Sequence, residues 1–318
     1  MIDPAMTNID IEEQRAWVMD RKTVTPWSDL AAELDIKLGT LSQFGSSKGY
    51  KGDELTLAEK IFRYRQTLTR QAAIALELPE VPGYFPTPTS DQLIEMLHFA
   101  QRGKLVVAAF GAGLGKTITA EHFKACYGNV FMATMTGSTA GINNMQAEIL
   151  EALGEKNPVG TPRALSKRIK HLVGELGNPL LIIDEAQHAS QLSIEEIRSW
   201  RDATGCGIAL LGNIGVLQRF HGGTSGSAFA QLSSRINLQL ERATALIEDI
   251  DALARAWKIG DHECQAYLRK LGVMPGGLRG LTFTLELALM AATNQGKPLE
   301  VRHIREAWQA RGARAVAA

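Results

Sequence analysis

The feature that most constrains this chain is an apolar run that leads directly into a glycine-rich turn. Residues 105–110 read Leu-Val-Val-Ala-Ala-Phe, and residues 111–117 read Gly-Ala-Gly-Leu-Gly-Lys-Thr. The apolar run is typical of a buried strand of a parallel sheet. Glycines let successive backbone N–H groups curl around an anion, and the start of the following helix adds its positive dipole end. The stretch therefore predicts a nucleotide site.

Each position of the turn has an expected role. Lys116 would reach the β- and γ-phosphates, and the Thr117 hydroxyl would ligate Mg²⁺. The phosphates would be surrounded by three glycines, Gly111, Gly113 and Gly115. Phe110 departs from the pattern G-x-x-x-x-G-K-[ST], because the first glycine comes one position late. The alternative is a glycine-rich turn with a chance Gly-Lys-Thr, which a second motif downstream disfavours.

The second motif is the apolar run 180–183, which Asp184 and Glu185 follow. Asp184 would stand at the carboxyl end of a buried strand, where ligands bind in open α/β sheets, and would hold Mg²⁺. Glu185 would orient and deprotonate the water that attacks the γ-phosphate. We expect this strand and the strand 105–110 to be neighbours in the sheet.

A further core strand is expected at residues 207–212, with Asn213 at its end. One strand over from Glu185, Asn213 would hydrogen-bond the γ-phosphate or the attacking water. The alternative is an asparagine that serves only a tight turn.

Composition narrows the class of protein. The 318 residues are enough for two or three domains, and 34 basic and 34 acidic residues give no net charge. Any nucleic-acid site must therefore be a local patch. No apolar run is long enough to span a membrane. The cysteines are isolated and have no metal-ligand spacing, which indicates reduced thiols in a cytoplasmic protein.

The chain divides by pattern into four parts. Residues 6–78 predict an all-helical module, and the proline-rich residues 79–90 a linker. The nucleotide-binding core would span residues 91–243, and helical periodicity fills residues 244–318. Residues 1–5 precede Met6, which we take as the natural start, and they play no part in the predicted fold.

Within the first module, residues 25–44 resemble a helix-turn-helix. Leu30, Ala31 and Leu34 would form the apolar stripe of its first helix, with Ile36 and Leu38 filling the turn. The outward side chains of the second helix would meet DNA, and they include Lys37, Thr40 and Gln43. The alternative is a small helical module that binds a protein.

A second candidate DNA contact is a helix that begins after Thr161, with Pro162 in its first turn. Its basic residues include Arg163, Lys167 and Arg168, and no acid occurs between Lys156 and Glu175. Such a run favours contact with the phosphate backbone, although a solvated helix face is the ordinary alternative.

Taken together, these motifs resemble AAA+ ATPases and, more narrowly, the MuB family of target-DNA-binding ATPases of phage Mu transposition. The resemblance covers nearly the whole chain. It is carried by the helix-turn-helix and by residues 48–53, 113–117, 182–186, 210–213, 234–236 and 275–279. It implies an α/β fold with an AAA+ P-loop core around a parallel sheet, a small C-terminal helical lid and the N-terminal helix-turn-helix module.

The resemblance also implies residue roles. Asn213 would be sensor 1, Arg279 sensor 2, and Arg235 the arginine finger offered to a neighbouring subunit's γ-phosphate. Thr136 and the helix bearing Arg163 would face double-stranded DNA in an ATP-dependent helical filament or ring, with a transposase as partner. Two other classes stay open at this point: an AAA+ loader of a protein such as a replicative helicase, and a nucleotide-gated helix-turn-helix regulator.

Overall fold

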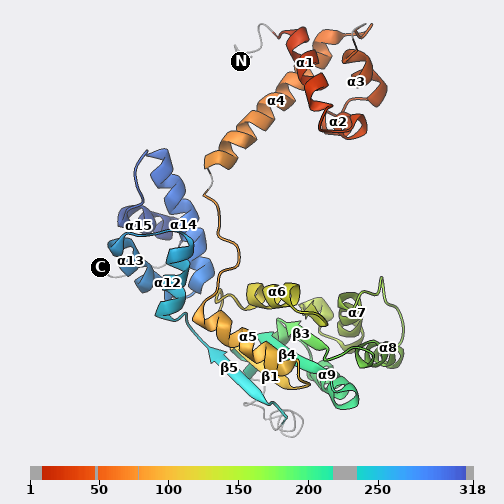
Figure 1. Ribbon diagram of the computed structural model, residues 1–318, viewed down its shortest axis with the longest axis vertical. Coiled ribbons are helices and arrows are strands. Elements are labelled where there is room, and N and C mark those ends of the chain that lie inside the picture. Colours follow the sequence, from red (N-terminus) through yellow and green to blue (C-terminus); the bar gives the residue numbers. More distant parts are fainter. Residues whose placement is uncertain (1–8, 47–48, 78, 218–234, 313–318) are drawn as a thin grey trace. The chain divides into compact units, whose positions relative to one another are not determined.

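The computed structural model of the chain describes residues 9–46, 49–77, 79–217 and 235–312 (Figure 1). The expected start at Met6, Lys48 of the 48–53 motif and Ser234 of the 234–236 motif lie outside the described residues. The chain forms two compact units, Met1–Pro79 and Glu80–Ala318, and each is described by itself. In the described part of the chain, no helix is long and apolar enough to cross a membrane.

The first unit is built from four described helices. They are α1 (Ile11–Arg21), α2 (Trp27–Glu33), α3 (Leu38–Phe44) and α4 (Glu54–Glu77). Asp10 caps α1 by accepting hydrogen bonds from the N–H groups of Glu12 and Glu13. The interior is apolar, with Val18, Leu30, Leu41, Phe44 and Ile61 fully buried.

The turn between α2 and α3 lies where the sequence predicts it, but one side chain predicted to fill the turn is exposed. Asp35 adopts a left-handed backbone with a φ of 49°, and Lys60 Nζ lies 2.8 Å from its carboxylate. Ile36 is buried, as predicted. The prediction for Leu38 was wrong, since its side chain is 50% exposed. Leu38 is the first residue of the short helix α3, whereas Ile36 before it and Leu41 after it are buried.

The described residues of the second unit form a sheet of five parallel strands in the order β2-β3-β4-β1-β5. The strands are β1 (Leu105–Phe110), β2 (Val130–Thr134), β3 (Leu180–Asp184), β4 (Gly207–Gly212) and β5 (Leu238–Arg242). The expectation that β1 and β3 are neighbours was wrong, because β4 lies between them. The connection from β1 to β2 passes over two strand positions, which β3 and β4 fill later in the chain.

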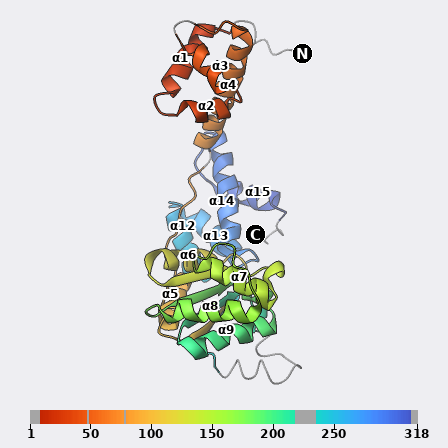
Figure 2. The same ribbon diagram turned by 90° about the vertical axis from the view of Figure 1, so that its right-hand side faces the viewer.

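Helices cover both faces of the sheet. One face carries α5 (Pro88–Ala100) and α6 (Lys116–Cys126). The other carries α7 (Ile142–Ala152), α8 (Pro162–Gly174) and α9 (Gln191–Thr204), which lie side by side in Figure 2. Successive β1 residues alternate between the two apolar clusters, as in a strand buried on both sides. The predicted α/β fold with a parallel sheet is confirmed.

Four helices follow β5 within the described residues, which end at 312. They are α12 (Ile247–Ala256), α13 (His262–Gly272), α14 (Gly277–Asn294) and α15 (Val301–Ala310), called the lid below. The lid shares an apolar cluster with α5 and α6. The carboxylate of Asp249 is 1% exposed, and it accepts hydrogen bonds from Thr89 N–H (2.9 Å), Thr89 Oγ1 (2.6 Å) and Leu246 N–H (2.9 Å). This carboxylate ties the first lid helix to the start of α5. The boundaries 6–78, 79–90, 91–243 and 244–318 remain predictions.

Candidate nucleotide-binding site

The glycine-rich turn joins β1 to α6, and its backbone explains its sequence. Gly113 and Gly115 have φ angles of 77° and 83°, which favour glycine. A Cβ at Gly111 would lie 2.1 Å from the carbonyl oxygen of Ala243, so this position also needs glycine. Phe110 is 2% exposed and is the last core residue of β1. Phe110, where the motif would have glycine, is therefore part of β1, and the turn begins at Gly111.

Lys116 brings the two sequence motifs together. Its Nζ lies 3.1 Å from Oδ1 of Asp184 and 3.1 Å from Oε1 of Glu185. The Thr117 hydroxyl donates to the other oxygen of Asp184 at 2.7 Å. Asp184 is 1% exposed, so its charge needs these partners to be tolerated in the interior. Lys116, Thr117, Asp184 and Glu185 thus form one connected cluster at the carboxyl edge of the sheet.

Glu185 has an unusual backbone and an ionised carboxylate. Its φ of 52° is left-handed, and its N–H donates to Asp184 Oδ1 at 2.9 Å. Partial burial acts to raise the pKa of Glu185, but hydrogen bonds from Gln187 and Lys116 and the charge of Lys116 outweigh it. The pKa of Glu185 is held below its usual value of 4.5. The carboxylate is therefore kept in its ionised form.

Asn213 lies at the end of β4, between the strand ends that carry the two motifs. Its Oδ1 accepts a hydrogen bond from Gly215 N–H at 2.9 Å, and its backbone carbonyl accepts from Val216 N–H. Asn213 also lines the cavity beside the glycine-rich turn. Asn213 thus stabilises the turn after β4 and also lines the cavity.

The cluster opens into a cavity of about 560 Å³, within the range of small-molecule sites. One wall is the glycine-rich turn, and a second is the extended segment 81–85, whose Tyr84 ring stacks on His122 with centroids 3.7 Å apart. Leu253 of α12 and Trp257, the residue directly after α12, line a third. Sequence reasoning missed the 81–85 wall, although aromatic residues within a proline-rich stretch were the available signal.

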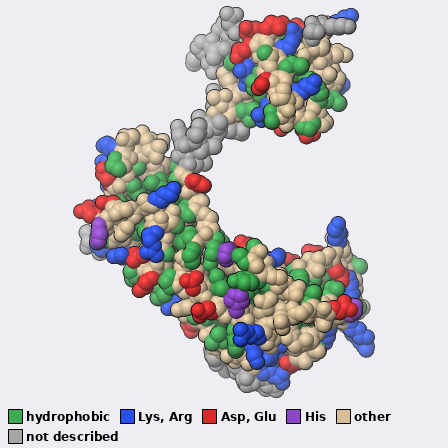
Figure 3. All heavy atoms as spheres, viewed as in Figure 1, with side chains coloured by type: hydrophobic (Ala, Val, Ile, Leu, Met, Phe, Trp, Pro, Cys, Tyr) green, Lys and Arg blue, Asp and Glu red, His purple; other side chains and the backbone are tan. Residues whose placement is uncertain are grey.

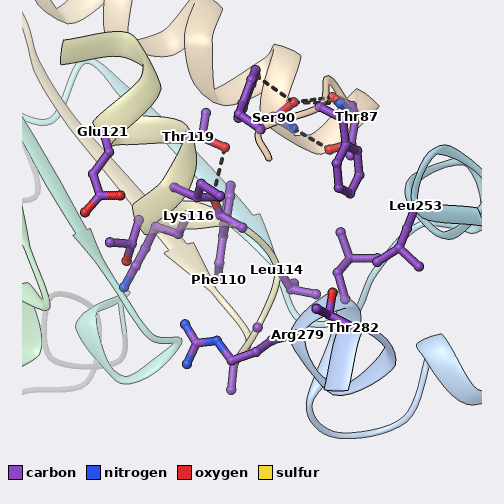
Figure 4. Close-up of a pocket in the computed structure, with 18 of the residues that line it drawn as sticks. Thr87, Ser90, Phe110, Leu114, Lys116, Thr119, Glu121, Leu253, Arg279 and Thr282 are labelled. Atoms are coloured by element: carbon purple, nitrogen blue, oxygen red, sulfur yellow. Dashed lines mark hydrogen bonds between the residues drawn. The ribbon is translucent and has the colours of Figure 1, made fainter. Parts of the chain in front are cut away.

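Arg279 reaches this cavity from the first turn of α14. Its N–H donates to the carbonyl of Gly113 at 3.1 Å, and a Cβ on Gly113 would lie 2.1 Å from the carbonyl oxygen of Gly276. In Figure 4 the side chains of Lys116 and Arg279 extend from opposite walls toward the same side of the cavity. The lid and the glycine-rich turn are therefore in direct backbone contact.

Arg235 lies away from this cavity. It precedes β5, whose parallel pairing with β1 places Leu238 opposite Val106 and Arg242 opposite Phe110. Arg235 is thus near the amino ends of the strands, whereas the glycine-rich turn is at their carboxyl ends. Its guanidinium pairs with Asp202 of α9, and its side chain is 46% exposed. From this position Arg235 serves no group in its own subunit's cavity.

The residues expected to contact DNA lie on three surfaces. Thr136 is exposed after β2, and Arg163 and Lys167 are exposed on α8. Figure 3 shows basic side chains at the edge of the core where α7 and α8 lie. Arg168 is less exposed than Arg163 and Lys167. Its guanidinium pairs with Glu155 and also donates a hydrogen bond to the Val159 carbonyl oxygen at 3.2 Å. In the first unit Lys37 and Gln43 are exposed, and Thr40 is half-buried.

The fold and the site define a P-loop nucleotide-binding protein of the AAA+ class. The family model described as "AAA domain" matches residues 101–220, and the model "Mu B transposition protein, C terminal" matches residues 234–310. ATP-dependent target DNA activator B of Escherichia phage Mu is 32% identical over 292 residues, which cover 90% of each chain. The chain belongs to the Mu B family of transposition proteins.

Two further proteins show how far the likeness extends. The Mu-like prophage FluMu DNA transposition protein B of Haemophilus influenzae is 32% identical over 261 residues, 81% of this chain and 89% of that protein. A chain of the Drosophila ORC structure bound to DNA has a TM-score of 0.53 at 15% identity, covering 74% of this chain and 63% of that chain. The second likeness concerns the fold alone.

A substitution in the turn tests the contact between turn and lid. Gly113→Ala places a Cβ against the Gly276 carbonyl and strains a left-handed φ, so we expect nucleotide affinity to fall about tenfold or more. Gly128→Ala is the control, because no atom lies within 4 Å of its added Cβ. Titration of a fluorescent ATP analogue measures both. Equal affinity in the two variants would contradict the turn geometry.

Proposed function

We propose that this protein is an ATP-dependent DNA-binding ATPase that assembles on target DNA and activates a DNA transposase. One observation carries the proposal: Lys116, Thr117, Asp184 and Glu185 meet within hydrogen-bonding distance, and all of them except the buried Asp184 line one cavity. Membership of the Mu B family gives this site its context, since relatives are named for ATP-dependent activation of target DNA. Family membership also disfavours a helicase loader.

The residues present fit a magnesium nucleotide. The Thr117 hydroxyl and an Asp184 carboxylate oxygen are 2.7 Å apart, so both can ligate one hard cation. Mg²⁺ bound there would neutralise charge on the β- and γ-phosphates. Lys116 and Arg279 supply cations from two walls of the cavity. The segment 81–85 and Trp257 supply the apolar surface for the base.

Hydrolysis is assigned to Glu185. Its carboxylate lies at the cavity and is ionised, with Lys116 on one oxygen and Gln187 on the other. A carboxylate in this state can accept a proton from a water aligned with the γ-phosphate. Asn213, from the next strand end, would hold that water or the γ-phosphate.

We expect Glu185→Gln to retain ATP binding and to lose most turnover, by about a hundredfold or more, because the amide cannot accept the proton. Phosphate release under saturating ATP measures turnover, and nucleotide titration measures affinity. Glu195→Gln makes the same change of charge on α9 and serves as the control. Unchanged turnover in Glu185→Gln would remove Glu185 from the mechanism.

Sequence-non-specific DNA contact is assigned chiefly to the second unit. Arg163 and Lys167 project from α8, and the hydroxyl-rich turn at Thr136 follows β2. These side chains suit phosphate oxygens, which carry no sequence information. The first unit, with Lys37, Thr40 and Gln43, provides a second contact in this proposal.

The double variant Arg163→Ala/Lys167→Ala should lower affinity for random-sequence duplex in the presence of ATP. The salt slope should fall by about one unit for each DNA phosphate that a subunit no longer binds. Arg255→Ala/Lys297→Ala removes two exposed lid cations and is the matched control. Fluorescence anisotropy measures binding. Unchanged binding in the first variant, with weaker binding in Lys37→Ala, would move recognition to the helix-turn-helix and favour a regulator.

Activity is also proposed to depend on self-association into a helical filament or ring. Arg235 has no access to its own cavity but is exposed for a neighbour, and arginine fingers in trans raise turnover by roughly 10³–10⁵. A transposase that stimulates hydrolysis would then release the assembly from sites it already occupies.

Arg235→Ala should leave ATP affinity nearly intact while abolishing ATP-stimulated oligomers or their turnover. Arg198→Ala is the control, because Arg198 pairs with the same Asp202 carboxylate oxygen at 2.9 Å. Light scattering and phosphate release at several protein concentrations measure the effect. A fully active monomer, or an equal decrease in the two variants, would refute a role in trans.

A further inference from the structure

Gln187 touches two parts of the site that belong to different strands. It lies in the short 3-10 helix η3 (Ala186–His188), directly after Glu185. Its Nε2 donates a hydrogen bond to Glu185 Oε2, and its Oε1 accepts one from the backbone N–H of Asn213 at 3.2 Å. One carboxamide therefore bridges the end of β3 and the turn after β4.

The backbone of β4 leaves room for this bridge. A Cβ on Gly212 would lie 2.6 Å from Gln187 Oε1 and 2.3 Å from a methyl group of Val216. Glycine at the last position of β4 thus lets the Gln187 side chain pass to the Asn213 N–H. The side chain is placed by packing as well as by its hydrogen bonds.

We infer that Gln187 is a positioning residue for ATP hydrolysis. It fixes the position of the Glu185 carboxylate relative to the turn that carries Asn213. The inference rests on the proposed role of Glu185 and adds a partner for it. Gln187 acts through Glu185 and Asn213, both of which line the cavity.

The need for such a residue follows from the surroundings of Glu185. Its side chain is 37% exposed, so packing alone leaves it rotational freedom. Lys116 holds Oε1, but the same ammonium group serves the phosphates when nucleotide is bound. The hydrogen bond from Gln187 to Oε2 does not compete with phosphate. It therefore fixes the carboxylate through the reaction.

The chemistry of the bridge requires an amide. A carboxamide donates through its nitrogen and accepts through its oxygen at the same time. Glutamate of the same shape accepts from Asn213 N–H but cannot donate to Glu185, and it adds a like charge beside it. Methionine has a similar length and makes neither strong bond. These two replacements separate the role of the bridge from the role of side-chain volume.

The experiment compares Gln187→Met and Gln187→Glu with wild type in the full chain. We expect kcat to fall about tenfold in each, with ATP affinity within about threefold, because the bridge positions a reacting group and touches no nucleotide. The decrease in kcat should be larger for Gln187→Glu, because this variant also adds a like charge beside Glu185.

Gln191→Met makes the same replacement at the first residue of α9 and is the control. Thermal unfolding establishes that the variants are folded. A wild-type kcat in Gln187→Met would overturn the inference. So would a decrease confined to ATP affinity, which indicates a structural role. Turnover retained in Glu185→Gln would instead overturn the proposed function, so the two failures are distinguishable.

Discussion

The interaction on which the site depends is the contact of Lys116 with Asp184 and Glu185, made across an intervening strand. Neighbouring strands lie about 4.8 Å apart, so the ends of β1 and β3 are separated by roughly twice that distance. A long side chain from the first turn of α6 spans this gap. Asp184 is 1% exposed, and burying its charge without Lys116 and Thr117 would cost several kcal/mol. The two motifs therefore stabilise each other.

The lid depends on the same turn. Gly113 and Gly276 approach so closely that a side chain on Gly113 would collide with the Gly276 carbonyl. A shift of α14 toward the turn would likewise displace the turn. Asp249 adds a second attachment, because its buried carboxylate binds the start of α5 and caps α12. The glycine-rich turn and Arg279 are thus linked by a backbone hydrogen bond, and the Asp249 side chain links α12 to α5. Under the proposed function, movement of the lid would change the phosphate site directly and so could couple assembly to ATP.

The sequence predicted the parts of the site that depend on local pattern, and it failed where distant segments meet. Apolar runs located β1, β3 and β4, and Thr161 with Pro162 located the start of α8. The position of β4 between β3 and β1 was missed, because hydrophobic periodicity within a strand does not indicate which strands are neighbours in the sheet. Glu155 lies just outside the acid-free run, yet it pairs with Arg168 in space. Gln187 was missed because its two partners come from different strands.

The pairing of Arg168 bears on how DNA affinity is built. The chain has no net charge, and Glu155 satisfies one of the basic groups that α8 offers. Few cations per subunit then remain for phosphate contact, so a single copy would bind duplex weakly at physiological salt. Repeating the same few contacts along a filament raises the affinity without any new contact. Under the proposed function, ATP therefore controls DNA binding by controlling assembly, and a modest patch on each subunit makes that control reversible.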